Sequence, residues 1–144
     1  MDNIKQKYYS DMQKYISELD YISRGEYLSY HAKKCVEKGV LQMYKEFYKE
    51  CDRNLNVFFT SLYEKGYGIG EVINKDKLYR LSFEQCTCNL VKEYYVKSKD
   101  FCECSRQSIL YVMNSLDKHK KFSVEMTSTI LSGDENCSFI ISIY

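Results

Sequence analysis

The sequence predicts an α+β fold in which N-terminal helices pack on a small antiparallel sheet. Up to residue 66, apolar residues recur at three- and four-residue steps, which is typical of amphipathic helices. From residue 77 onward, alternating runs typical of strands appear, and a turn-rich segment separates the last two. The order of helices, strand, helix and two strands therefore indicates helices on an antiparallel sheet, with a strand-helix-hairpin C-terminal half.

The helical half begins with a stripe at residues 4–19, formed by Ile4, Tyr8, Met12, Tyr15, Ile16 and Leu19. We expect a second helix to start near Gly25 or Glu26 and to carry Leu28, His31 and Cys35 on one face. Gly39 either ends or weakens it, and the apolar spacing then continues over residues 40–51. Asn54 is placed to cap a further helix, with the apolar face Leu55, Phe58, Phe59 and Leu62. Gly66, Gly68 and Gly70 then break the pattern.

The second half starts with a predicted strand over residues 77–83. A helix follows, which Asp100 is placed to cap with Glu103 as its capping-box partner. Residues 122–130 and 137–143 alternate as two more strands. The turn-forming residues 132–136 between them predict an antiparallel hairpin.

Length and charge limit the classes of function. A chain of 144 residues suits one domain, so we predict a single domain over 1–144, with a helical half at 1–66 and a strand-helix-strand-strand half at 77–144. The formal net charge is +1, which argues against a nucleic-acid partner. The N-terminus lacks a signal-peptide pattern, and no apolar stretch approaches the roughly 18 residues of a membrane span. We therefore expect a cytoplasmic protein with no membrane partner.

Seven cysteines are the main chemical signal. Cytosolic thiols stay reduced, so clustered cysteines indicate metal or redox chemistry. Two C-x-C pairs, separated by 13 residues, could supply four thiolates for tetrahedral Zn²⁺. The second pair lies at the start of a helix, where the helix dipole favours thiolate. The predicted zinc ligands are Cys86, Cys88, Cys102 and Cys104. An iron–sulfur cluster ranks below zinc, and a redox cluster or inert buried thiols remain open.

Four other residues form a second candidate site. His31 and Cys35 are four residues apart on one helix face, a spacing that suits two ligands of one metal ion or two core residues. Cys137 opens the last strand, either as a core residue or as a fifth thiol near the cluster. Glu125 alternates with Val124 and Met126, so it is expected to face away from them, toward solvent or a polar site.

Motifs in the second half resemble a known pattern. The chain reads C-T-C-N-L-V-K from Cys86, F-C-E-C-S from Phe101, V-E from Val124 and S-T-I-L-S-G-D-E-N-C-S-F-I-I from Ser128. Over residues 54–143 it resembles an uncharacterised bacterial and archaeal cysteine-motif family, C-x-C…C-x-C-S…G-D-x-x-C. That family is similar to L-2-amino-thiazoline-4-carboxylic acid hydrolase-like proteins and to the 4-vinyl reductase small-molecule-binding domain. The chain departs from the pattern at Asn89, where proline is usual, and at Ser132, where glycine is common.

The resemblance implies a helix–sheet pocket for an unidentified small molecule, a zinc site near the C-terminal hairpin and a homodimer. The first expectation is therefore a small-molecule-binding or sensor-type domain with a cysteine-rich zinc site. The Tyr, Phe and Met content fits such a pocket. One alternative is a hydrolase of a small thiazoline or cyclic amide-like substrate, with Cys104 or a zinc-bound water as nucleophile. Another is a thiol redox switch or an interaction module.

Overall fold

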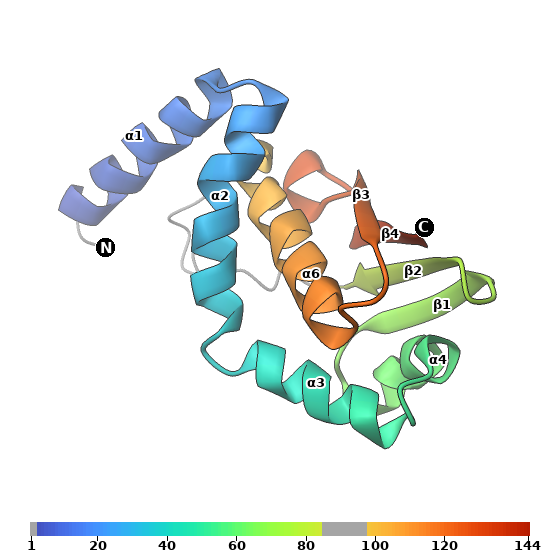
Figure 1. Ribbon diagram of the computed structural model, residues 1–144. Coiled ribbons are helices and arrows are strands. Elements are labelled where there is room, and N and C mark those ends of the chain that lie inside the picture. The colour runs from blue at the N-terminus through green and yellow to red at the C-terminus, as the bar shows by residue number, and fades with distance from the viewer. Residues whose placement is uncertain (1–2, 85–97) are drawn as a thin grey trace.

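The computed structural model describes residues 3–84 and 98–144 and confirms the predicted α+β class (Figure 1). The α-helices are α1 Asn3–Glu18, α2 Tyr21–Val36, α3 Val40–Glu50, α4 Leu55–Lys65 and α6 Glu103–Leu116. The strands are β1 Ile69–Asn74, β2 Leu78–Phe83, β3 Phe122–Ser128 and β4 Cys137–Ile143. Two short 3₁₀ turns, η1 Lys99–Cys102 and η2 Ile130–Ser132, precede α6 and β4 respectively.

The strands form an antiparallel sheet in the order β1-β2-β4-β3. The predicted C-terminal hairpin is confirmed, because β3 pairs antiparallel with β4. Side chains alternate between the two faces of each strand, so residues paired across strands share a face. One row that faces the helices contains Tyr79, Ile141 and Val124, and all three are buried.

Helices cover one face of this sheet. α4 packs against β1 and α6 packs against β3. The ring of Phe59 on α4 stacks on Tyr79 of β2, with the ring centroids 4.5 Å apart. The main core lies between α3, α4, α6 and the sheet. α2 lies beside α6 on the side away from the sheet, and α1 extends away from the body (Figure 1).

Strand β1 is an element that the sequence pattern did not indicate. We expected Gly66, Gly68 and Gly70 only to break the helical pattern. Gly66 does end α4, in the left-handed conformation with φ 74°, but Gly70 lies within β1 opposite Leu81. A Cβ atom at Gly70 would collide with the backbone carbonyl of Phe59. Glycine therefore lets the strand approach α4 closely.

Helix α2 begins at Tyr21, so the predicted start near Gly25 or Glu26 is wrong. The Asp20 carboxylate accepts a hydrogen bond from the backbone N–H of Ser23 at 2.8 Å and caps the helix there. Gly25 lies inside α2 and is buried against Glu103 and Gln107 of α6. The predicted Asn54 cap of α4 is confirmed, because its side chain accepts hydrogen bonds from two backbone N–H groups.

The predicted capping box of α6 is also wrong. Ser98 caps η1 by accepting a hydrogen bond from the Asp100 N–H at 3.3 Å, and α6 follows η1 directly. The Asp100 carboxylate instead pairs with Arg24 of α2 at 3.2 Å. Glu103 accepts hydrogen bonds from Arg106 Nε at 2.8 Å and from Gln107 Nε2 at 3.0 Å. The Asp100 carboxylate therefore links η1 to α2, and the Glu103 carboxylate bonds to side chains of α6. Neither carboxylate caps α6.

The first helix forms as predicted, but half of its apolar stripe is exposed. Ile16 is buried near Leu28 and Phe101, whereas Ile4 and Tyr8 are 80% and 64% exposed. This exposure follows from the position of α1 at the edge of the molecule. None of the helices in residues 3–84 and 98–144 combines the length and apolar character needed to cross a membrane.

Candidate functional site

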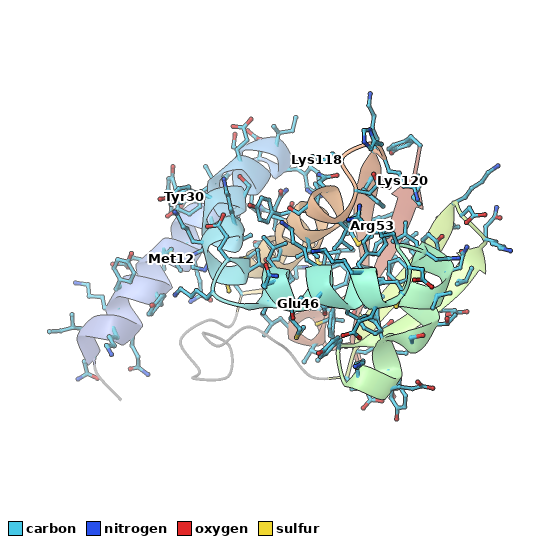
Figure 2. All side chains as sticks on the ribbon, turned by 60° about the horizontal axis from the view of Figure 1, so that its bottom comes forward. Met12, Tyr30, Glu46, Arg53, Lys118 and Lys120 are labelled. Carbon is cyan, nitrogen blue, oxygen red and sulfur yellow. The ribbon has the colours of Figure 1, made fainter. Side chains whose placement is uncertain are left out.

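A cavity of about 700 Å³ lies between the helices and the sheet. This volume falls in the range of small-molecule pockets, roughly 300–1,000 Å³. Its wall includes residues of α2, α3, α4, α6, η1 and the sheet. Figure 2 turns the molecule so that α3, marked by Glu46, comes forward. The resemblance implied a pocket between these two layers, and the cavity lies there.

The cavity wall is mainly apolar. Its buried part includes Phe58, Phe59, Leu62, Met113 and Phe139. Among the described residues that line it, Glu84 is the acidic residue and none is lysine or arginine. Glu84 is exposed. The interior therefore offers no fixed cation to an anionic ligand within the described part of the wall.

Cysteines from four parts of the chain contribute to this wall. Cys35 comes from α2, Cys102 from η1, Cys104 from α6 and Cys137 from β4. Cys35 is exposed, and the other three are buried. Cys51 lies in the main core instead, and burial raises the pKa of its thiol. Four of the cysteines named from the sequence thus line one cavity.

Contacts between the short turns link these thiols. The ring of His31 on α2 meets the ring of Phe101 edge-on, with the centroids 5.7 Å apart. η1, which contains Phe101 and Cys102, contacts η2. At the start of η2, the backbone N–H of Ile130 donates a hydrogen bond to Cys137 Sγ at 3.4 Å. The thiol-bearing part of the wall therefore runs from α2 through η1 and η2 to β4.

The predicted zinc site stays a prediction. Cys86 and Cys88 lie outside the described residues. Within residues 3–84 and 98–144, no three His, Cys, Asp or Glu side chains form a group that could hold a metal ion. Glu125 is exposed and faces away from Val124, as the alternation predicted, and it lies outside the cavity wall. His31, Cys35 and Cys137, the other members of the second candidate site, line the cavity.

Two polar side chains of the wall have shifted pKa values. Tyr44 on α3 donates a hydrogen bond to the backbone carbonyl of Tyr67 at 2.7 Å, and burial raises the pKa of its phenol to about 12. The His31 side chain is exposed, yet the protein around its ring removes enough water to lower its pKa, and the charge of Lys38 lowers it further. At neutral pH His31 is therefore mainly the neutral imidazole, which can accept a proton.

The sequence pattern did not indicate that α3 and α4 contribute to the cavity wall. Met43, Tyr44 and Tyr63 line the cavity, and none was a candidate. Phe58, Phe59 and Leu62 were identified only as a core face. A core and an apolar cavity wall share the same helical periodicity, so the pattern could not distinguish them.

Comparisons with known proteins add little to this geometry. No family model matches the chain, and no curated protein matches its sequence. Among solved structures, the chain is similar to the trafficking protein particle complex subunit 3 from Naegleria fowleri, whose crystal structure has palmitic acid covalently bound. The identity is 14%, the TM-score is 0.46, and the match covers 98% of this chain and 93% of that one. A similarity at this level does not assign a function.

Proposed function

We propose that the protein binds a neutral, mainly apolar small molecule in the cavity between the helices and the sheet, as a ligand-binding or sensor-type domain. The observation that carries this proposal is the cavity of about 700 Å³ with its mainly apolar wall. Apolar ligands gain about 25 cal/mol for each Å² of surface that leaves water, so such a wall favours them.

The lack of charged side chains in the interior of the described wall disfavours ionic ligands. A buried charge without a partner costs several kcal/mol. The described wall contains no lysine or arginine to pair with a carboxylate or phosphate. The phenol of Tyr44 already donates a hydrogen bond to the backbone carbonyl of Tyr67. A neutral ligand therefore suits the wall better than a charged one.

Fluorescence titration with Nile red, a neutral apolar dye, tests the proposal. Val36 on α2 is 5% exposed and lines the cavity, so Val36→Phe places a ring in the space of the ligand. Val57 on α4 is 44% exposed and lies outside the cavity wall, so Val57→Phe makes the same change elsewhere. We expect Nile red to bind the natural protein and Val57→Phe alike, and Val36→Phe at least tenfold more weakly.

Circular dichroism and thermal melting of the three proteins show whether each is folded. If Val36→Phe does not fold, Ser108→Leu on α6 extends a different side chain that lines the cavity. Equal affinity of Nile red for folded Val36→Phe and Val57→Phe would overturn the proposal, because the dye would then bind elsewhere.

A cytoplasmic location accompanies this proposal, because reducing conditions keep the cavity cysteines as thiols. Zinc binding, a homodimer, hydrolysis and a redox switch stay predictions from the sequence and its resemblance. The metal content of protein purified without chelator would test the first of them.

A further inference from the structure

The rim of the cavity, meaning the exposed residues of its described wall, combines a thiol with an imidazole. Among the described residues that line the cavity, His31, Cys35, Val40, Tyr63, Gly66 and Glu84 are exposed. Cys102, Cys104 and Cys137 are 7%, 8% and 8% exposed. Among these four cysteines, the thiol of Cys35 is therefore the one that is open to solvent.

His31 and Cys35 lie one helical turn apart on the same face of α2, and both line the cavity. The edge contact with Phe101 positions the His31 ring. The imidazole ring of His31 carries a nitrogen that can accept a proton. A histidine one helical turn from a cysteine, on the same helix face, is spaced to take the proton of the thiol when a ligand is bound.

We propose that Cys35 is the attachment site for neutral electrophiles with an apolar body, of the α,β-unsaturated carbonyl class, and that His31 assists as the proton acceptor. This inference rests on the proposed function, because the cavity must hold the apolar body while the electrophilic carbon meets Cys35. The absence of lysine and arginine from the described wall favours such an uncharged ligand.

The addition needs no other reactant. The Cys35 thiol passes its proton to His31, and the sulfur forms a bond to the β-carbon of the enone. The π electrons of the carbon–carbon double bond move to the α-carbon, which takes the proton back from the imidazolium. The product is a thioether with an intact carbonyl. No group leaves, and nothing is oxidised or reduced overall.

The four other cysteines among the described residues provide internal controls. Cys51 is buried in the main core, away from the cavity wall, and burial raises the pKa of its thiol, so its reactive thiolate is scarce. Cys102, Cys104 and Cys137 line the cavity but are buried. Reaction at Cys35 in preference to these four cysteines would therefore reflect its exposed position on the cavity wall rather than the reactivity that all thiols share.

Two enones that differ only in their tails separate the role of the cavity from that of the thiol. Oct-1-en-3-one carries a five-carbon apolar tail where methyl vinyl ketone carries a methyl group. Mass spectrometry of peptides gives the rate of adduct formation at each cysteine, and glutathione gives the rate ratio of the two enones without a cavity. We expect the adduct mainly at Cys35. The rate with oct-1-en-3-one divided by the rate with methyl vinyl ketone should be at least tenfold higher at Cys35 than for glutathione.

Three variants complete the experiment. Val36→Phe should return the rate ratio to that of glutathione, whereas Val57→Phe should leave it unchanged. His31→Gln should slow both enones about tenfold and keep their ratio, because it removes only the proton acceptor. Melting curves establish that each variant is folded. If Val36→Phe is not, Ser108→Leu replaces it.

Adducts spread over several cysteines, a rate ratio equal to that of glutathione, or an unchanged rate in folded His31→Gln would each overturn the inference. The Nile red titration shows whether such a result contradicts only the attachment site at Cys35 or also the proposed ligand site. If the dye binds in the cavity while Cys35 shows no selectivity, the ligand site stands and the attachment site is wrong. If the dye does not bind in the cavity, both are wrong.

Discussion

Tyr44 shows how one side chain of the cavity wall links stability to pH. Burial raises the pKa of its phenol from 10.0 to about 12, so folding favours the protonated form. This contribution to stability is complete below about pH 10 and is lost as pH rises toward 12. The hydrogen bond from Tyr44 to the Tyr67 carbonyl adds about 1 kcal/mol.

We therefore expect Tyr44→Phe to lower the unfolding free energy by about 1 kcal/mol at pH 7. Between pH 10 and 12 its stability should fall less steeply than that of the natural protein, because one raised pKa is gone. Urea denaturation at a series of pH values measures both effects. Equal slopes in this pH window would show that Tyr44 ionises normally in the folded protein.

At the residue scale, the sequence predicted part of the candidate site. The i and i+4 spacing placed His31 and Cys35 on one helix face, and strand alternation turned Glu125 away from the core; both expectations hold. The pattern could not show that Cys35 and Cys137 line a common cavity, because that depends on how α2 and β4 pack. Cys86 and Cys88 lie outside the described residues, so the predicted zinc site of four cysteines stays a prediction.

At the element scale, a buried ion pair positions α6 between α2 and the sheet. The Glu103 carboxylate is 4% exposed and accepts hydrogen bonds from Arg106 and Gln107. Arg106 also donates to the Val124 carbonyl of β3 at 3.0 Å. Gly25 of α2 approaches the same group, since a Cβ there would lie 3.4 Å from Glu103 Oε1. One carboxylate therefore lies where two helices and a strand meet.

Glu103→Ala should lower the unfolding free energy by about 3 kcal/mol, because it leaves the half-buried Arg106 guanidinium without its carboxylate. Glu46→Ala is the control, since Glu46 is exposed on α3 (Figure 2) and should change stability by less than about 0.5 kcal/mol. Urea denaturation measures both variants. A similar small change in the two would show that the buried pair does not hold α6 in place.

Local signals predicted most elements but not all of their ends. The Asn54 cap and the alternating strands β2, β3 and β4 were predicted because each depends on neighbouring residues. β1 was missed because its glycines resemble a helix-breaking loop in the sequence. Gly70 is in fact needed where β1 packs closely against Phe59 of α4, and this contact between two elements does not show in the local pattern. The predicted start of α6 was wrong because Glu103 bonds to Arg106 and Gln107 instead of capping the helix. Contacts between elements override local propensity at these points.

At the scale of the whole molecule, the α+β class followed from the change of hydrophobic period between the two halves. The period does not fix how far the helical layer stands from the sheet. In the structure α3, α4 and α6 form the main core with the sheet, and residues of the same helices, together with α2 and η1, also line a cavity of about 700 Å³. This space is the basis of the ligand-binding proposal.

The methionines offer the most direct test of that proposal. Met43 and Met113 line the cavity, whereas Met12 and Met126 lie outside its wall. In NMR spectra of protein labelled with ¹³C at the methionine methyl groups, we expect naphthalene, a neutral apolar probe, to shift the Met43 and Met113 signals saturably. The Met12 and Met126 signals should stay nearly fixed. Unchanged Met43 and Met113 signals at saturating naphthalene would contradict the account.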